Sequence, residues 1–135
     1  MQNGPNKLKY TKIRKKRLVK FESKSNKLKF GKFGLKALES GLLNFKQIDS
    51  AKQIIRKKTK RKLKLWVKIF PYLPVSAKPV GARMGKGKGK LVNFAAPIKA
   101  GSLIFEICGL NNKLLIKSLL SCKVKFPIRT AICYK

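Results

Sequence analysis

Leu63-Lys64-Leu65-Trp66-Val67-Lys68-Ile69-Phe70 is the stretch from which the fold of this chain is most readily inferred. Its aliphatic residues alternate with lysine and aromatic residues, which is the period-two pattern of a strand with one face in the core. The other face combines lysines with Trp66 and Phe70. Aromatic side chains among lysines can stack on nucleic-acid bases, and they can also pack beneath a helix or a loop. The sequence leaves both alternatives open.

A helix is predicted just before this strand, over residues 44–60. Asn44 suits the N-cap position, and Gln47 stands where the second residue of a capping box belongs. Apolar residues then repeat at helical spacing through Ile48 and Ile55. The other faces and the C-terminal turns carry the cations Lys46, Lys52, Arg56, Lys57, Lys60 and Arg61. Because like charges one turn apart repel each other, contact with phosphate groups is preferred here to a solvated surface.

A long connection follows the strand and is predicted as a loop over residues 71–90. It ends in the run Arg83-Met84-Gly85-Lys86-Gly87-Lys88-Gly89-Lys90. Glycine lets the backbone approach a partner closely, and lysine and arginine neutralise phosphate. A loop of this length in a small domain is usually functional. It is not a phosphate-binding P-loop, because no Ser or Thr follows a Gly-Lys pair, and it lacks the spacing of a dinucleotide-binding fingerprint.

The rest of the chain predicts an α+β fold. The further elements are a strand with a bulge or bend over residues 30–38, strands over 91–98 and 103–108, a helix from Asn111 or Asn112 to about Lys123, and a strand over 128–134. Gly41 is expected to end the first of these. Two helices on one face of a mixed or antiparallel sheet, a two-layer sandwich, is the simplest packing. We therefore expect a basic extended arm over residues 1–29 and a single α+β domain over residues 30–135.

The charge of the chain predicts a polyanionic partner. Its 135 residues include 35 Lys and Arg against 4 Asp and Glu, so the formal net charge is +31. Such a charge works against folding in free solution unless a more negative partner neutralises it. Nucleic acid is the first candidate, because basic groups release the counterions condensed on its phosphates. A basic amphipathic protein of a membrane surface and a DNA-binding architectural protein are the alternatives. The arm is expected to be disordered alone and to order on its partner.

Composition also argues against an enzyme. The chain has no histidine, so imidazole catalysis is excluded. The four carboxylates are scattered, at Glu22, Glu39, Asp49 and Glu106. Three cysteines, at Cys108, Cys122 and Cys133, are not in metal-binding spacing and are expected to be free thiols in a reducing compartment. We therefore expect no metal, no cofactor and no catalytic residues, and no run of residues is apolar enough to span a membrane.

Four blocks of the sequence resemble the bacterial-type large-subunit ribosomal protein L16 family (uL16). They are Phe30-Gly31-x-Phe33-Gly34-Leu35-Lys36-Ala37, Gln47-Ile48-Asp49-x-Ala51, a central block of Trp66-Val67-x-Ile69-Phe70-Pro71 with Lys78-Pro79 and Arg83-Met84-Gly85-Lys86-Gly87-Lys88-Gly89, and Pro127-Ile128-Arg129-Thr130. The opening Thr11-Lys12-x-Arg14-Lys15 is similar to that of the family, though less closely. The resemblance covers nearly the whole chain. Departures occur at Asn93-Phe94-Ala95-Ala96 and Asn111-Asn112-Lys113, and lysines replace most arginines of the first helix.

The resemblance implies a small α+β sandwich with a hammerhead-like β-unit. It also implies a structural protein that binds large-subunit rRNA near the peptidyl transferase centre and supports accommodation of aminoacyl-tRNA. The expected partners are rRNA, tRNA and neighbouring ribosomal proteins, without membrane insertion or homo-oligomers. The expected rRNA-binding residues are Lys9, Lys12, Arg14, Lys15, Lys16, Arg17, Lys36, Lys52, Arg56, Lys60 and Arg61. The expected tRNA-proximal loop residues are Lys78, Arg83, Met84, Lys86, Lys88 and Lys90.

The composition bears on where the chain works. Lysine far outnumbers arginine, and asparagine, isoleucine and phenylalanine are plentiful; all of these favoured residues have AT-rich codons. Together with the departures from the family pattern, this indicates an organelle-encoded copy. We expect a mitochondrial ribosome in the matrix, with a plastid or a bacterial cytoplasm as the alternatives.

Overall fold

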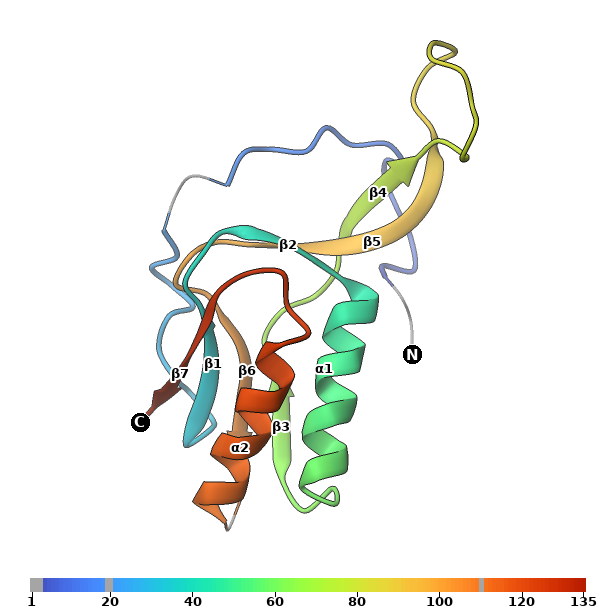
Figure 1. Cartoon of the computed structure of the whole chain (residues 1–135). Coiled ribbons are helices and arrows are strands. Elements are labelled where there is room, and N and C mark those ends of the chain that lie inside the picture. The colour runs from blue at the N-terminus through green and yellow to red at the C-terminus, as the bar shows by residue number, and fades with distance from the viewer. Residues whose placement is uncertain (1–3, 19–20, 110) are drawn as a thin grey trace.

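A computed structural model describes residues 4–18, 21–109 and 111–135 of the chain (Figure 1). The described residues form seven strands and two helices. In chain order these are β1 (Phe33–Ala37), β2 (Gly41–Asn44), α1 (Phe45–Lys58), β3 (Lys64–Val67), β4 (Leu73–Ala77), β5 (Lys90–Ile98), β6 (Leu103–Cys108), α2 (Asn112–Lys123) and β7 (Thr130–Tyr134). The α+β class that the sequence predicts is confirmed.

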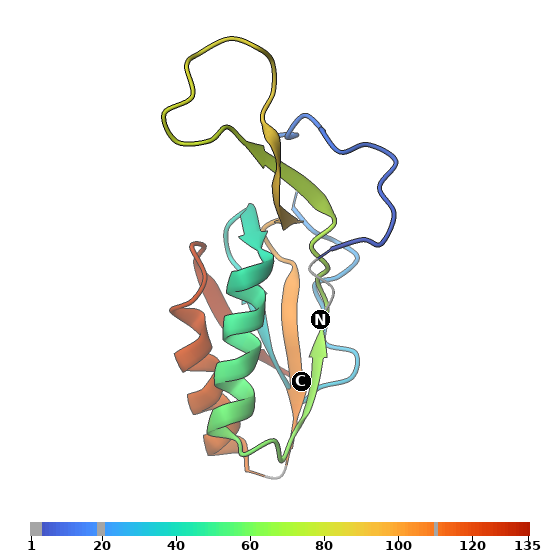
Figure 2. The same ribbon diagram turned by 90° about the vertical axis from the view of Figure 1, so that its right-hand side faces the viewer.

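Four strands form the larger sheet, in the order β3-β6-β1-β7, and all its neighbours are antiparallel. The helices α1 and α2 lie side by side over one face of this sheet (Figures 1 and 2). Between the two layers, Leu35 and Phe105 of the sheet pack with Ile55 of α1 and Leu119 of α2, and all four side chains are fully buried. Each such burial contributes roughly 1.5–3 kcal/mol, so this layer is the main source of stability.

The opposite face of the same sheet is covered by the end of the N-terminal segment, residues 21–31. There the N–H of Leu103 donates to the carbonyl of Ser25 over 3.0 Å. Because side chains alternate along a strand, the position of Gly34 faces away from the helices. An added Cβ at Gly34 would come within 2.5 Å of the Cδ2 atom of Leu28. Glycine therefore lets the Leu28 side chain lie close against β1, and a larger residue here would have to displace it.

The remaining three strands form a second antiparallel sheet in the order β2-β5-β4. β2 runs directly into α1. β4 and β5 form a hairpin that extends beyond the helical layer, with residues 78–89 as the loop at its tip (Figure 1). The sandwich thus carries the loop at the end of a two-stranded projection.

Helix α1 has Asn44 as its N-cap, as predicted, and it ends at Lys58, two residues before the predicted end. The N–H of Asn44 donates to the side-chain oxygen of Gln47 over 2.9 Å, as expected for a capping box. At the other end, the hydroxyl of Thr59 donates to the carbonyl of Ile55 over 2.8 Å. The last turn carries three cations, which suit the negative end of the helix dipole.

Some strands differ from their predictions. Gly41 does not simply end a strand; it begins β2, which is too short to show an alternating pattern. The predicted loop over residues 71–90 contains β4, and its last residue, Lys90, begins β5, so the loop itself is residues 78–89. Pro74 made this stretch look like loop, but β4 is an edge strand, where a proline costs no ladder hydrogen bond. The strands are also divided between two sheets, where one was expected.

The strand predicted over residues 63–70 is present as β3, but it is shorter than predicted. It covers only Lys64–Val67 and lies at the edge of the larger sheet. Leu65 packs against the core as expected, whereas the Val67 side chain is exposed. An edge strand has a neighbouring strand on one side only, and Val67 lines an open hollow beside Phe45 and Ile48 of α1.

Candidate nucleic-acid interface

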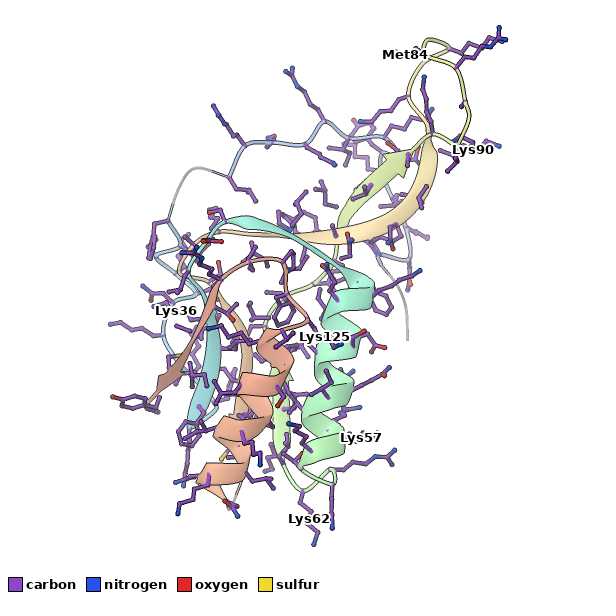
Figure 3. The ribbon with its side chains drawn as sticks, viewed as in Figure 1. Lys36, Lys57, Lys62, Met84, Lys90 and Lys125 are labelled. Atoms are coloured by element: carbon purple, nitrogen blue, oxygen red, sulfur yellow. The ribbon has the colours of Figure 1, made fainter. Side chains whose placement is uncertain are left out.

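The loop of residues 78–89 is exposed almost throughout. Met84 lies at its tip with 96% of its surface exposed, and Lys90 lies at its base (Figure 3). Gly85 and Gly87 have φ values of +91° and +79°, which other residues rarely adopt. An added Cβ at either glycine would meet nothing within 4 Å, so the backbone conformation, rather than crowding, requires glycine there. The tip is shaped by its backbone and held away from the body of the protein.

The N-terminal arm lies against this loop. The Lys12 ammonium donates to the carbonyl of Lys88 over 2.9 Å, and the Lys88 ammonium donates to the carbonyl of Ile13 over 2.8 Å. These reciprocal contacts join segments that are 75 or more residues apart in the sequence. They place Lys12 beside the loop, and the following cations Arg14 to Lys16 line a hollow with Tyr72 and Leu73 at the start of β4, the strand that leads to the loop. We call residues 12–17 together with loop residues 78–89 the arm–loop surface.

A second basic surface lies at the C-terminal end of α1. Arg56, Lys57, Lys60 and Arg61 line a hollow there, together with Gln53 and Leu63; we call these four cations the α1 cluster. Lys60 and Arg61 have φ values of 49° and 61°, in the left-handed region that residues other than glycine rarely adopt. The N–H of Arg61 donates to the carbonyl of Arg56 over 3.0 Å, which folds the chain back over the helix end. The turn thereby gathers cations around one hollow.

The two surfaces lie at opposite ends of the protein. In Figure 3, Met84 marks the loop at one end, and Lys57 and Lys62 mark the end of α1 at the other. The structure therefore brings the predicted arm and loop residues together, but it does not bring them to the predicted residues of the α1 cluster. Lys36 lies on β1 and belongs to neither surface (Figure 3). Residues 1–3 and 19–20 of the predicted arm lie outside the described residues.

The acidic residues neutralise cations outside these surfaces. Glu22 pairs with Lys99, and Glu39 pairs with Arg129. The third ion pair joins Glu106 to a lysine of the segment after β3. None of the three lysine or arginine partners was predicted as a binding residue. Three of the four carboxylates thus form ion pairs with cations outside the two basic surfaces. The arm–loop surface and the α1 cluster therefore keep a strong positive charge.

Glu106 has a structural role that its isolated position among the scattered carboxylates did not predict. It lies in β6 with its side chain fully buried. One carboxylate oxygen accepts hydrogen bonds from the N–H groups of Lys29, Phe30 and Gly31, over 3.1, 2.7 and 2.9 Å. The other oxygen lies 3.5 Å from the Lys68 ammonium. Burial alone would raise the pKa of Glu106, but these three donors and Lys68 outweigh it and lower the pKa below its ordinary value.

Signals for this role were present in the sequence. Glu106 is the only charged residue in a strand that is otherwise apolar, and a buried charge must be paired and hydrogen-bonded. Its neighbours also decide between the two readings of Trp66. The ring of Trp66 stacks on the ring of Phe30, with the two centroids 5.9 Å apart. The Lys68 ammonium lies over the same Phe30 ring, 4.8 Å from its centroid. Trp66 therefore packs against Phe30 in the loop just before β1, while Phe70 remains 54% exposed.

Other kinds of site find no support in the part of the chain that the structure describes. No group of three or more potential metal ligands occurs among those residues. Likewise, neither described helix has the length and hydrophobicity to cross a bilayer. The cysteines of the described residues are free thiols, and burial raises the pKa of Cys122 to about 12, so its thiol stays protonated.

Comparison with known proteins gives a consistent family. The model of a family described as ribosomal protein L16p/L10e matches residues 5–133. A protein of Orientia tsutsugamushi (strain Boryong), named large ribosomal subunit protein uL16, is 41% identical over 129 residues, which are 96% of this chain and 95% of that protein. Proteins of the same name from Carsonella ruddii (strain PV) and Borrelia recurrentis (strain A1) are each 38% identical, over 100% and 94% of this chain and 100% and 92% of theirs.

Proposed function

The chain belongs to the ribosomal protein L16p/L10e family, and we propose that it binds large-subunit rRNA near the peptidyl transferase centre and supports accommodation of aminoacyl-tRNA. As a member of this family, it is a structural protein of the large ribosomal subunit and not an enzyme. Its partners there are rRNA and other ribosomal proteins. The proposal assigns separate surfaces of the chain to rRNA and to tRNA.

The α1 cluster and residues 12–17 of the arm bind rRNA phosphates. The observation that carries this part is the pair of exposed basic surfaces whose cations are not the ones neutralised by Glu22, Glu39 and Glu106. Lysine and arginine contacts with phosphate fix position and orientation but do not read bases. Specificity then comes from the shape of folded RNA, because the rigid sandwich holds two basic surfaces a fixed distance apart.

The loop of residues 78–89 extends toward tRNA. Its tip carries the exposed residues Arg83, Met84 and Lys86 at the end of the β4–β5 hairpin. Lys12 and Lys88 hold its base beside the arm, so arm and loop meet RNA as one surface. No chemistry is required of the loop. The loop orders the surrounding rRNA, and Arg83 contacts phosphates of the RNA backbone when aminoacyl-tRNA enters.

The experiment that tests this assignment maps crosslinks in assembled large subunits. A photoreactive residue is placed at Lys15, at Arg61 or at Met84. We expect the first two positions to crosslink to different rRNA segments, and Met84 to crosslink to tRNA or adjacent rRNA only when aminoacyl-tRNA is bound in the accommodated state. Subunits that contain the chain but give no RNA crosslink from any of the three positions would overturn the assignment.

We also propose that the ribosome concerned is mitochondrial. The lysine-rich, AT-type composition supports this location. A bacterial cytoplasm is the second candidate, because bacterial relatives match this chain over its full length. Fractionation of the source cells separates the two: the mitochondrial proposal predicts that the chain co-purifies with mitochondrial ribosomes, and a chain found on cytoplasmic ribosomes of a bacterium contradicts it.

A further inference from the structure

Helix α2 is apolar on two opposite sides. Its inner side packs on the sheet through Leu115, Leu119 and Cys122, all nearly or fully buried. A second apolar row consists of Ile116, Leu120 and Val124, spaced four residues apart, with 36%, 53% and 81% of their surfaces exposed. We call these three residues the outer row. They lie one above another on the helix surface, because residues four apart share a face.

The outer row is not an extension of the core. A helix turns about 100° per residue, which places Leu120 far around the helix from Leu115 and Cys122. A helix of a soluble domain normally keeps one apolar stripe and a polar opposite side, whereas a helix that is apolar on both sides is usually covered on both. Contiguous exposed apolar side chains of this kind mark sites of interaction. The outer row therefore lacks its cover in the isolated chain.

The surroundings of the outer row indicate what covers it. Lys113, Lys117 and Lys123 stand beside it on the exposed part of α2, and Lys125 follows the helix (Figure 3). Helix α2 contains no acidic residue. A second copy of this chain would bring these lysines against each other, and like charges in contact are unfavourable. A segment with apolar side chains flanked by Asp or Glu complements both the row and its rim.

RNA fits this face less well than it fits the α1 cluster. The outer row consists of aliphatic side chains, which offer neither hydrogen bonds to phosphate nor a flat ring on which a base can stack. Covering it with RNA would leave apolar surface against a charged backbone. Covering it with protein removes that surface from water, which is favourable by about 25 cal/mol per Å² of apolar area.

We propose that the outer row of α2 docks an acidic, amphipathic segment of a neighbouring protein of the large ribosomal subunit. The proposal rests on the membership of the chain in that subunit and gives its protein partner a specific surface. It divides the molecule by function: the arm–loop surface and the α1 cluster face RNA, and the outer row of α2 faces protein.

Photocrosslinking in intact large subunits tests the proposal. p-Benzoylphenylalanine replaces Leu120, and in a matched variant it replaces Gln53 on α1, which lines the hollow of the α1 cluster. We expect position 120 to crosslink to a protein segment that is rich in Asp or Glu and apolar on one side, and position 53 to crosslink to rRNA. Crosslinks from position 120 to rRNA, to a second copy of the chain, to a protein segment without acidic residues, or to nothing would each overturn the proposal.

A second variant separates docking from folding. Val124→Asp places on the most exposed residue of the outer row a charge that repels an acidic segment, and at this exposed position the fold should be unaffected. With the photoreactive residue at Ile116, this substitution should lower the protein crosslink by about tenfold or more. Arg129→Ala serves as the control and should leave that crosslink unchanged, because Arg129 belongs to neither basic surface nor to the outer row. An undiminished crosslink in Val124→Asp contradicts the proposal. If the wild-type chain is absent from large subunits, the proposed function fails; if it is present there and only the crosslink from position 120 disagrees, the outer row alone is wrongly assigned.

Discussion

The carboxylate of Glu106 lies 2.9 Å from the backbone nitrogen of Gly31, although the two residues are 75 positions apart in the chain. The same oxygen also accepts from the two preceding N–H groups, so one buried side chain fixes the point at which the N-terminal arm joins the sheet. Lys68 balances its charge from the segment after β3. The direction in which the arm leaves the domain is therefore set by an interaction within the core.

Replacing this carboxylate should destabilise the protein. Glu106→Gln keeps the shape of the side chain but removes its charge, and hydrogen bonds to charged groups are worth about 1.5–3 kcal/mol each in net stability. We expect the free energy of unfolding in urea to fall by about 2–4 kcal/mol, since removing one partner of a buried ion pair is costly. Glu39→Gln, which breaks the exposed pair with Arg129, should change it by less than about 1 kcal/mol. Equal stability of Glu106→Gln and the wild type would contradict this role.

The same residue predicts a pH dependence. The pKa of Glu106 is lowered in the folded state, so the folded protein holds its proton less tightly than the unfolded chain does. This contribution to stability is present above the pKa of an unfolded glutamate and is lost as pH falls through the folded pKa. Because the chain has only four acidic residues, few other groups titrate in that range. Acid should destabilise the wild type more than Glu106→Gln, as measured by urea unfolding at a series of pH values; parallel pH profiles would show that Glu106 is not responsible.

Arg83 should matter for tRNA and not for incorporation. It lies in the exposed loop, away from the body of the domain. We expect Arg83→Ala to enter large subunits at the wild-type level and to slow accommodation of aminoacyl-tRNA, measured by fluorescence transfer between labelled tRNAs. Arg129→Ala is a suitable control, because Arg129 is exposed but belongs to neither basic surface. Loss of the Arg83→Ala protein from subunits would contradict this division of roles.

The α1 cluster should contribute counterion release. For the isolated chain on an rRNA fragment, removing one phosphate contact lowers the slope of log K against log salt by roughly 0.7–0.9. We expect Arg56→Gln and Arg61→Gln each to lower the slope by about this amount. Lys113→Gln on α2 should leave it unchanged, because that face is assigned to protein. An unchanged slope in both arginine variants would mean that the cluster does not contact phosphate.

The joining of arm and loop can be tested in the same assay. Lys12→Gln and Lys88→Gln each remove one of the two reciprocal hydrogen bonds between these segments. If arm and loop bind RNA as one surface, the double variant should lose less affinity than the sum of the two single losses, because either change alone already separates the segments. Strictly additive losses would indicate that arm and loop act independently.

Much of the fold could be predicted from local pattern. Three local signals, the capping pair Asn44 and Gln47, the helical spacing of Ile48 and Ile55, and the short apolar run of β6, depend on residues close together in the sequence. β2 and β4 could not be predicted in this way. Both are short, and Pro74 in β4 resembles a loop signal until the strand is known to lie at an edge, which depends on pairing with β5.

The candidate site was predictable in composition but not in arrangement. The charge of the chain and the glycines of the loop are visible in the sequence. That Lys12 meets Lys88, and that the α1 cluster lies at the opposite end, depends on contacts across the whole chain. The role of Glu106 was missed for the same reason, because its three donors lie 75 to 77 residues earlier in the chain.

The most direct test of the account is the amount of this chain in purified large ribosomal subunits. Subunits are isolated from the source cells, washed in high salt and measured by quantitative mass spectrometry against established subunit proteins. We expect about one copy of the chain per subunit after the wash, since folded RNA and protein enclose it on several surfaces. Recovery of the chain as a soluble protein in the ribosome-free fraction, with subunits complete without it, would contradict the account.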